Sequence, residues 1–396
     1  MKKSRGTVFV GMSGGVDSSV AAMLLKNQGY DVTGVYLKCY IQPDRSCLKE
    51  AMDAMEVAEQ LGIPFHIWDF QKEYKERVIN YMIEGYRAGQ TPNPDIECNR
   101  EIKFGMFLEK ALKWGGTHVA TGHYVRLGRT RIMNKELGIR EEKFSLLEAK
   151  DKNKDQSYFL WTLTQAQLKH ALFPIGDYLK PEVREMAKKA GLKTADKKDS
   201  QGICFLGKVT LDEFLKEYLP EKRGAVLNVA GEKLGEHNGA HFYTIGQRHI
   251  GIMNNELGVR NKKKREGRGD TKPVYVVRKD VKKNTLTVAE GGDENLTRRE
   301  VELRGVNFLD STYSNVLKNN GIVKVWARVR YRQPLFEATL IKLRAPKNKF
   351  QKFKLVFMKP QKFVAQGQSA VLYTKKGPSS AKASTGKEMI GGGIIR

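Results

Sequence analysis

A short apolar segment that runs into a small-residue loop, close to the start of the chain, most constrains the fold. Residues 8–11 form an apolar run ending in glycine, which is typical of a buried parallel strand. Residues 12–19 are rich in glycine and serine, and residues 20–26 favour a helix. Glycine lets the backbone approach a phosphate closely, and the N–H groups and dipole of a first helical turn attract anions. The stretch therefore predicts a phosphate site between a strand and a helix.

Two common phosphate loops are excluded by the residues themselves. No Lys-Ser or Lys-Thr pair follows the glycines, and the G-x-G-x-x-G spacing of dinucleotide-binding folds is absent. The sequence Ser-Gly-Gly-Val-Asp-Ser at residues 13–18 instead resembles the pyrophosphate loop of ATP pyrophosphatases, which split ATP into AMP and pyrophosphate. This resemblance implies that the loop holds pyrophosphate and that Asp17 is linked to magnesium. An ordinary glycine-rich turn between a strand and a helix is the alternative.

Strand and helix signals alternate through residues 7–127, and residues 128–154 are expected to be a charged surface excursion. Further elements are expected at residues 31–37, 46–61, 65–70, 73–86, 100–114, 117–121 and 180–191. Repeated strand–helix units predict an α/β fold with a doubly wound parallel sheet, which binds ligands at the carboxyl ends of its strands.

The second half of the chain has a different pattern. From residue 224 onward, short β-rich segments alternate with glycine, asparagine and lysine, as in a small β domain followed by a barrel. We therefore expect a catalytic domain over residues 1–207, a small β-rich central domain over residues 208–275 and a C-terminal β-barrel over residues 276–396.

The charge of the chain favours a polyanionic partner. Lysine and arginine total 70 against 44 acidic residues, a formal net charge of +26. RNA, DNA and an anionic membrane surface all fit such a surplus, and solvated lysine faces are the alternative. Arginine alternates with an aromatic residue at Arg330-Tyr331-Arg332, which favours nucleic acid. We expect a cytoplasmic protein that does not bind a membrane, because no long apolar run and no apolar leader segment is present.

The four cysteines, Cys39, Cys47, Cys98 and Cys204, form neither a disulfide framework nor a C-x-x-C zinc pattern. Asn99 is a plausible N-cap of the helix at residues 100–114, which would place the Cys98 thiol at the positive end of that helix. This placement predicts a lowered pKa and a thiolate, with a buried loop cysteine as the alternative. For Cys204, among glycine and apolar residues, core packing is at least as good an interpretation as chemistry.

Several motifs, taken together, point to one family. In chain order they lie at residues 11–18, 93–95, 98–99, 121–124, 154–158, 202–205, 246–248 and 367–371. Their sequences are Gly-Met-Ser-Gly-Gly-Val-Asp-Ser, Asn-Pro-Asp, Cys-Asn, Thr-Gly-His-Tyr, Lys-Asp-Gln-Ser-Tyr, Gly-Ile-Cys-Phe, Gly-Gln-Arg and Gly-Gln-Ser-Ala-Val. Over nearly its full length the chain resembles the tRNA-specific 2-thiouridylases of the MnmA type. The resemblance implies an enzyme that replaces the C2 oxygen of the wobble uridine by sulfur, with ATP adenylating that oxygen and pyrophosphate departing.

The resemblance also implies roles for individual residues. Cys204 would hold sulfur as a persulfide, Cys98 would be the nucleophile that completes transfer, and Asp95 would be the general acid or base. A disulfide between Cys98 and Cys204 is the implied by-product. The residues implied to contact ATP are Gly11, Met12, Ser13, Gly14, Gly15, Val16, Asp17, Ser18, Leu37 and Gly122. Those implied to contact the target base or tRNA are Asn93, Pro94, Asp95, His123, Lys154, Asp155, Gln156, Arg330, Tyr331 and Gln368.

The implied chemistry requires several partners. The urea-like C2 oxygen of uridine is a poor leaving group, and adenylation by ATP converts it into a good one. The target base must also be flipped out of its stack into a pocket. Two thiols are needed because the first carries the sulfur to be transferred as a persulfide. The second thiol then forms a disulfide with the first, which frees the transferred sulfur. The expected partners are tRNA in its anticodon stem-loop and a sulfur-relay protein or cysteine desulfurase. Magnesium is expected to accompany ATP, through Asp17, with no metal site built by the protein itself.

Some features fall outside this pattern. The segments at residues 130–142, 261–268 and 377–388 are longer than the family pattern and are interpreted as surface elaborations. Cys39 and Cys47 are interpreted as structural, with an iron–sulfur or metal role as the alternative. Two other functions remain open: an AMP-forming ligase such as an amidotransferase-type synthetase, which needs no cysteine pair, and a basic RNA-binding protein that keeps the nucleotide fold as a scaffold.

Overall fold

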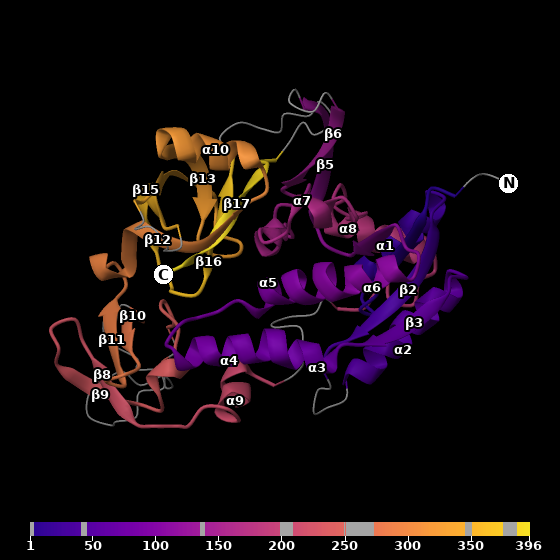
Figure 1. Cartoon of the computed structure of the whole chain (residues 1–396). Coiled ribbons are helices and arrows are strands. Elements are labelled where there is room, and N and C mark those ends of the chain that lie inside the picture. Colours follow the sequence, from indigo (N-terminus) through magenta and orange to yellow (C-terminus); the bar gives the residue numbers. More distant parts are fainter. Residues whose placement is uncertain are drawn as a thin grey trace.

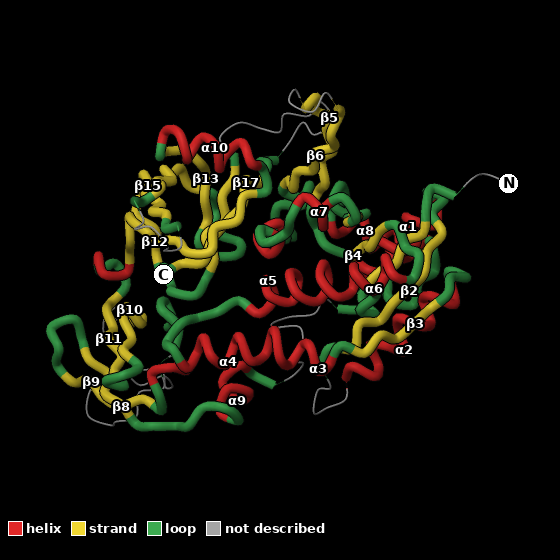
Figure 2. Tube along the Cα trace, in the orientation of Figure 1, coloured by secondary structure: helices red, strands yellow, loops and turns green. Residues whose placement is uncertain are grey.

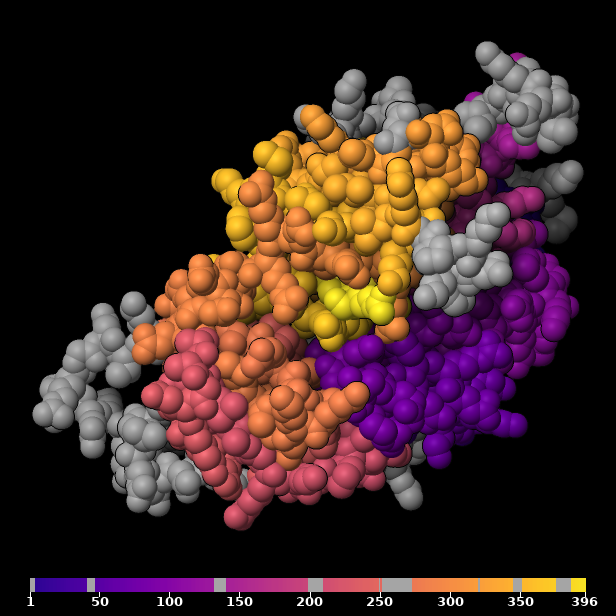
Figure 3. Space-filling model, turned by 60° about the vertical axis from the view of Figure 1, so that its left-hand side comes forward, coloured from indigo at the N-terminus to yellow at the C-terminus, as the bar shows by residue number. Residues whose placement is uncertain are grey.

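Three groups of secondary structure follow one another along the chain in a computed structural model (Figures 1 and 2). The structure describes residues 4–40, 46–134, 139–198, 209–248, 250, 273–344, 351–374 and 386–396. A parallel sheet with its helices comes first, a small central sheet follows, and a closed barrel ends the chain. Figure 3 shows the barrel, in orange and yellow, packed against both of the other groups.

The N-terminal unit is built on a five-stranded parallel sheet with the order β3-β2-β1-β4-β7. Its strands are β1 (Thr7–Gly11), β2 (Asp31–Lys38), β3 (Phe65–Asp69), β4 (His118–Thr121) and β7 (Ala171–Leu172). The first strand is central and its apolar residues are buried, as the run at residues 8–11 predicted. The predicted doubly wound α/β fold is confirmed. The two-residue strand β7 was not predicted, because so short a strand has no recognisable periodicity.

The two faces of this sheet are covered by different helices. The helical segments are α1 (Val16–Asn27), α2 (Ser46–Gln60), α3 (Gln71–Tyr74), η1 (Lys75–Ile79), α4 (Asn80–Arg87), α5 (Pro94–Cys98), η2 (Asn99–Met106), α6 (Phe107–Lys113), η3 (Ser157–Leu160), α7 (Gln165–Leu168), α8 (Lys180–Lys189) and α9 (Leu211–Lys216). Val8 and Val10 pack in one core with α1, α2 and α8, whereas Phe9 packs in the other with α4, η2 and α6. This alternation along β1 is what a strand buried on both faces requires.

Two long helices each contain a π-helical segment. The segments α3, η1 and α4 form one continuous helix, and α5, η2 and α6 form another that lies beside it (Figure 1). The π-helical residues are η1 in the first helix and η2 in the second. Such wide turns inside α-helices occur frequently at functional sites.

The segment expected to be a charged surface excursion contains a β-hairpin. Strands β5 (Arg126–Asn134) and β6 (Ile139–Leu147) pair antiparallel in a separate two-stranded sheet. The buried residues Phe144 and Leu146 alternate with more exposed ones near its base, while the rest of the hairpin is mostly polar. Because the apolar alternation covers so few residues, the sequence pattern did not reveal the strands.

The central sheet has the order β10-β11-β8-β9. It contains β8 (Gly224–Leu227), β9 (Lys233–His237), β10 (Val274–Asp280) and β11 (Thr285–Glu290), with the short helix η4 (Ala240–Phe242) beside it. Because β11 pairs with both β10 and β8, the sheet extends past residue 275, where the barrel was expected to begin.

The C-terminal unit is a closed barrel, as predicted, with the strand order β12-β15-β14-β13-β16-β17. Its strands are β12 (Thr297–Phe308), β13 (Ile322–Arg328), β14 (Phe336–Lys342), β15 (Phe353–Lys362), β16 (Ser369–Tyr373) and β17 (Met389–Ile395), accompanied by η5 (Glu294–Leu296) and α10 (Ser311–Asn320). Buried side chains such as Leu303, Leu355 and Phe357 fill its interior, so the barrel has a packed core. Among the described residues, no helix has the length and apolar character needed to cross a bilayer.

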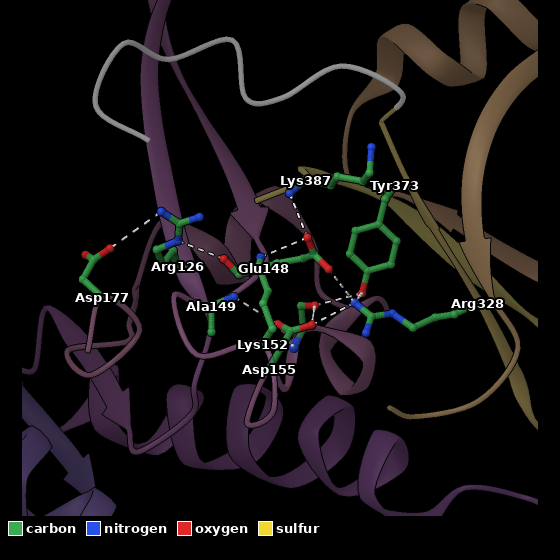
Figure 4. Close-up of polar contacts among 10 residues, drawn as sticks. Arg126, Glu148, Ala149, Lys152, Asp155, Asp177, Arg328, Tyr373 and Lys387 are labelled. Carbon is green, nitrogen blue, oxygen red and sulfur yellow. Dashed lines mark hydrogen bonds and ion pairs between the residues drawn. The ribbon is translucent and has the colours of Figure 1, made fainter. Parts of the chain in front are cut away.

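A buried charged cluster joins the barrel to the N-terminal unit (Figure 4). The Arg328 guanidinium, at the end of β13, donates to Asp155 Oδ2 at 2.8 Å and to Glu148 Oε1 at 3.2 Å. It also donates to the Tyr373 hydroxyl oxygen at 2.8 Å. All four side chains are almost fully buried, and Arg328 is the cation that pairs with Asp155, whereas Glu148 also accepts from Lys152 Nζ at 3.1 Å.

Replacing Arg328 by methionine leaves the buried Asp155 carboxylate without the cation that it pairs with, and leaves Glu148 with Lys152 alone. We expect a loss of about 3–5 kcal/mol in the free energy of unfolding, measured by guanidinium chloride denaturation, because an uncompensated buried charge is strongly unfavourable. Arg129→Met is the control: Arg129 pairs with Glu142 on the solvent-exposed hairpin, and its removal should cost far less. Equal losses in the two variants would contradict this account of the cluster.

Candidate active site

The loop after β1 closes around the start of α1 at the carboxyl edge of the sheet. Gly14 has a left-handed backbone (φ +68°), and a Cβ there would lie 2.3 Å from the Glu50 carbonyl oxygen. Ser18 Oγ accepts a hydrogen bond from Ser13 N at 3.2 Å and donates to the Gly15 carbonyl at 3.1 Å. The first N–H groups of a helix have no partner within the helix. Together with the helix dipole, they make this loop suited to bind a phosphate.

Asp17, in the first turn of α1, is bound by two buried donors from elsewhere in the chain. The Tyr124 hydroxyl donates to Asp17 Oδ1 at 2.8 Å. Lys180 Nζ donates to both carboxylate oxygens, at 2.7 and 2.8 Å. Gly122 packs against the same turn, since a Cβ there would lie 2.7 Å from Ser18 N. The segment at residues 121–124 and helix α8 therefore meet the loop at Asp17.

A second lysine also reaches the loop. Lys197 Nζ donates to the Gly14 carbonyl at 2.9 Å and pairs with Asp53. Lys180 and Lys197 thus place two cations beside the predicted phosphate site, as a polyphosphate requires. Sequence patterns did not reveal either lysine as a site residue. Neither belongs to a motif quoted above, and only the fold brings residues more than 160 positions apart into contact.

The remaining residues predicted to contact ATP surround this loop. Gly11 ends β1, and the side chains of Met12 and Val16 are buried beneath the loop. Leu37 lies near the carboxyl end of the neighbouring strand β2 and is half-buried. The structure therefore brings these residues together, with Gly122, at one edge of the sheet.

The described part of the chain does not offer a magnesium site made by the protein alone. No group of three or more Asp, Glu, His or Cys side chains there is arranged to hold a metal ion. Asp17, which the sequence links to magnesium, accepts hydrogen bonds from Lys180 on both of its oxygens. Magnesium prefers several oxygen ligands in octahedral geometry, so the residues present do not fit a protein-held ion.

The helix that contains Cys98 begins earlier than predicted. Asn93, rather than Asn99, is its N-cap: Asn93 Oδ1 accepts from Asp95 N at 3.1 Å and from Ile96 N at 3.3 Å. Pro94 occupies the first helical position, where a missing N–H costs nothing. Cys98 therefore lies inside a continuous helix, and the prediction that its thiol lies at a positive helix end is wrong. The Asn-Pro sequence at residues 93–94 is itself a helix-start signal that could have shown this.

Burial raises the pKa of the Cys98 thiol to about 12. Lys103 lowers this pKa, and Cys39, Asp95 and Glu97 raise it further. The predicted lowering is wrong for this conformation, because the apolar surroundings disfavour the thiolate more than one lysine favours it. Burial also raises the pKa of the neighbouring Glu97 to about 7, partly offset by Arg100.

His123 connects the loop region with the Cys98 helix. Its Nδ1 lies 2.7 Å from Thr121 Oγ1, and its ring contacts Phe104 of η2 and Phe173 at centroid distances of 6.2 and 6.3 Å. Burial lowers the pKa of His123 well below its ordinary value, and Lys103 adds to the effect. A neutral imidazole therefore lies between the two parts of the site at neutral pH.

Loops of the barrel lie close to both ends of the segment at residues 91–99, which contains Cys98. The Tyr331 ring packs on Phe159 at a centroid distance of 4.5 Å, and the Phe159 carbonyl accepts from Asn99 Nδ2 at 3.2 Å. Gln368 Nε2 donates to the Thr91 carbonyl at 2.8 Å, two residues before Asn93. The predicted tRNA-contacting residues of the barrel thus lie near the predicted base-contacting segment at residues 93–95. Arg330 lies on the same loop, with its guanidinium 5.3 Å from the centre of the Phe363 ring.

The predicted tRNA contacts at residues 154–156 have internal partners in this structure. Asp155 is buried and accepts hydrogen bonds from Ala149 N, Ser157 and Arg328. Gln156 N donates to the Tyr124 carbonyl at 2.8 Å, and Tyr124 N donates to Gln156 Oε1 at 2.9 Å. Lys154 is half-buried. Asp155 and Gln156 therefore hold protein segments together here.

The second predicted catalytic cysteine, Cys204, lies outside the described residues. The three segments interpreted as surface elaborations are also outside the described residues in part or in full. These are residues 135–138 of the segment 130–142, all of residues 261–268 and most of residues 377–388. Cys47 is buried, and its carbonyl accepts from the Tyr36 hydroxyl at 3.0 Å. Cys39 is half-buried just after β2, near enough to Cys98 to influence the pKa of that thiol.

Comparisons with known proteins match almost the whole chain. Residues 6–208 match the tRNA methyl transferase HUP domain, residues 212–290 the tRNA methyl transferase PRC-barrel domain, and residues 298–395 the aminomethyltransferase beta-barrel domain. The chain is 41% identical to the tRNA-specific 2-thiouridylase MnmA of Streptococcus thermophilus (strain CNRZ 1066), over 99% of this chain and 95% of the relative. It is 40% identical to the protein of the same name from Streptococcus mutans serotype c, with the same coverage.

The buried Cys98 thiol should react with iodoacetamide slowly and with a steep pH dependence. With a pKa of about 12, its thiolate fraction rises about tenfold per pH unit between pH 7 and 9, and the alkylation rate should follow without a plateau. Peptide mass spectrometry of the native protein, with Cys98→Ser to identify the signal, measures this rate. A plateau near pH 7 would show instead that the thiolate is already favoured in the free protein.

Proposed function

The chain belongs to the MnmA family of tRNA-specific 2-thiouridylases, and from this membership we propose how its residues thiolate the wobble uridine of tRNA. Identity of 41% over 99% of the chain supports the reaction itself. One structural observation carries the assignment of residues. The segment at residues 121–124 contacts the phosphate loop through Gly122 and Tyr124, and contacts the Cys98 helix through His123. The phosphate loop and the Cys98 helix thus lie on either side of one short segment, which supports an ATP site next to a thiol.

ATP binds at the start of α1 in this proposal. The N–H groups of Gly14, Gly15 and Val16 hold its phosphates, and Leu37 and Gly122 line the nucleotide. The glycine-only conformation of Gly14 and the position of Lys197 on its carbonyl support this binding mode. ATP supplies the adenylyl group that makes the C2 oxygen of uridine a leaving group. Magnesium arrives with the ATP phosphates, since the described residues do not form a complete metal site.

Sulfur transfer uses both predicted cysteines. The persulfide on Cys204 attacks C2 of the activated uridine and AMP leaves. Cys98 then attacks the Cys204 sulfur, which forms the Cys98–Cys204 disulfide and releases the thiolated base. Asp95 lies three residues before Cys98 in one helix, and this spacing places the two side chains on the same face. Asp95 is therefore in a suitable position to accept the Cys98 proton, which burial otherwise retains at neutral pH.

Transfer RNA contacts the barrel loops and the segment at residues 93–95. The net charge of +26 and the position of Tyr331 and Gln368 beside that segment support this surface. A sulfur-relay protein or a cysteine desulfurase supplies the persulfide in this proposal, because each turnover consumes one sulfur atom that must be replaced. The enzyme acts in the cytoplasm, where its tRNA substrate is modified.

The two-cysteine mechanism predicts the result of single serine substitutions. Cys98→Ser and Cys204→Ser should each lower tRNA thiolation at least about 10³-fold, since a nucleophile is lost, while ATP-dependent pyrophosphate release persists. Mass spectrometry of nucleosides from tRNA incubated with ATP, magnesium and a cysteine desulfurase with cysteine, which supplies sulfur at the persulfide level, measures the product. Cys47→Ser, at a buried position away from the proposed chemistry, should retain thiolation. Wild-type thiolation by either of the first two variants would refute the mechanism, and an AMP-forming ligase would need neither cysteine.

Asp17→Asn tests the assignment of the phosphate loop. Removal of the charge that Lys180 binds should lower ATP-dependent pyrophosphate release about 10²–10³-fold, because the cations around the phosphates lose their arrangement. Asp196→Asn, on an exposed carboxylate paired with Lys188, is the control and should release pyrophosphate normally. Unchanged release by Asp17→Asn would contradict the loop assignment. A wild-type chain that binds tRNA and forms no pyrophosphate would favour the scaffold alternative.

A further inference from the structure

The loop at Asp151–Gln156, here called the junction loop, contacts both donors of Asp17. Its first residue binds one of them: Asp151 Oδ2 accepts from Lys180 N at 3.0 Å. Its last residue, Gln156, exchanges two hydrogen bonds with the backbone of Tyr124, at 2.8 and 2.9 Å. The backbones of Lys180 and Tyr124 are therefore fixed by the two ends of one short loop.

The same loop is bound to the barrel through its fifth residue. Asp155 accepts from Arg328 at 2.8 Å and from the Ser157 hydroxyl at 2.9 Å, and the Tyr373 hydroxyl lies 2.8 Å from Ser157 Oγ (Figure 4). These side chains are almost entirely buried, and Tyr373 has no exposed surface. A second barrel segment binds beside them, since Glu148 Oε2 accepts from Lys387 N at 2.9 Å. The barrel therefore fixes the loop with geometrically specific polar contacts.

We propose that Arg328 and Tyr373 are positioning residues for the ATP site, acting through the junction loop on the Tyr124 and Lys180 donors of Asp17. The inference rests on the proposed function, which places ATP at the start of α1 and tRNA on the barrel. A displacement of the barrel by tRNA must move the loop or break buried hydrogen bonds, and either change reaches Asp17. Binding of tRNA to the barrel and of ATP to the loop are therefore coupled, and the coupling is reciprocal.

Two conservative substitutions separate positioning from mere structural support. Tyr373→Phe removes one buried hydroxyl and keeps the ring, and Tyr124→Phe removes only the hydroxyl bound to Asp17. We expect each to raise the Kd of a non-hydrolysable ATP analogue, by about tenfold for Tyr124→Phe and several-fold for Tyr373→Phe, measured by calorimetry on the full chain without tRNA. Ser157→Ala should reproduce Tyr373→Phe, because it removes the other end of the same contact.

The double variant supplies the decisive comparison. Tyr373→Phe acts in part through Tyr124 in this proposal, so the rise in Kd for Tyr373→Phe combined with Tyr124→Phe should be smaller than the product of the two single fold-changes. The affinity of Tyr373→Phe for tRNA without ATP should equal that of wild type, since the buried hydroxyl cannot touch RNA. General damage to the barrel would not leave tRNA affinity intact while lowering ATP affinity.

Asn307→Ala is the matched control. Asn307 Nδ2 also joins the barrel to the N-terminal unit, by donating to the Trp161 and Leu163 carbonyls, but it does not contact the junction loop. The Kd of the ATP analogue for the Asn307→Ala variant should equal the wild-type value. A wild-type Kd in Tyr373→Phe, additive effects in the double variant, or an equal change in Asn307→Ala would overturn the inference. Failure of the wild-type chain to bind the analogue would instead refute the proposed ATP site, so the two failures are distinguishable.

Discussion

The register of three parallel strands places the residues around the phosphate loop at one edge of the sheet. Gly11, the last residue of β1, pairs with Val35 on one side and Thr121 on the other. The phosphate loop and the segment that follows Thr121 therefore leave the sheet at the same level, beside Leu37 near the end of β2. A shift of one residue in either pairing would turn these side chains to the opposite face and separate them. The chemistry of the site thus depends first on strand register, and only then on the individual side chains.

Burial and reactivity conflict at Cys98. A thiol with a pKa of about 12 is protonated at neutral pH and resists oxidation and alkylation. Each unit by which that pKa falls requires about 1.4 kcal/mol of additional stabilisation of the thiolate. The value of about 12 already includes the favourable charge of Lys103, so this stabilisation must come from other groups. The proposed role of Asp95, which accepts the Cys98 proton, is one way to meet this requirement.

The sequence predicted the features that depend on local pattern and missed those that depend on distant pairs. The strand, loop and helix at residues 8–26 and the change to β structure after residue 224 were predicted correctly, because periodicity and small residues mark them. Lys180 and Arg328 were missed as site or junction residues, since their partners Asp17 and Asp155 lie more than 160 residues away. The N-cap of the Cys98 helix was misplaced for a different reason. Two asparagines stand in candidate cap positions, and the proline that follows Asn93 identifies the correct one.

The joint between barrel and N-terminal unit is polar where it meets the junction loop, and this chemistry has a consequence for function. An apolar interface tolerates small displacements, because dispersion contacts are many and weakly directional. The contacts of Arg328, Asp155, Ser157 and Tyr373 are few and directional, and their burial makes an unpaired group costly. Such a joint has discrete arrangements rather than a continuous range. The barrel is therefore connected to Asp17 by a series of directional hydrogen bonds and backbone links, through which the proposed binding of tRNA to the barrel would act on the phosphate loop.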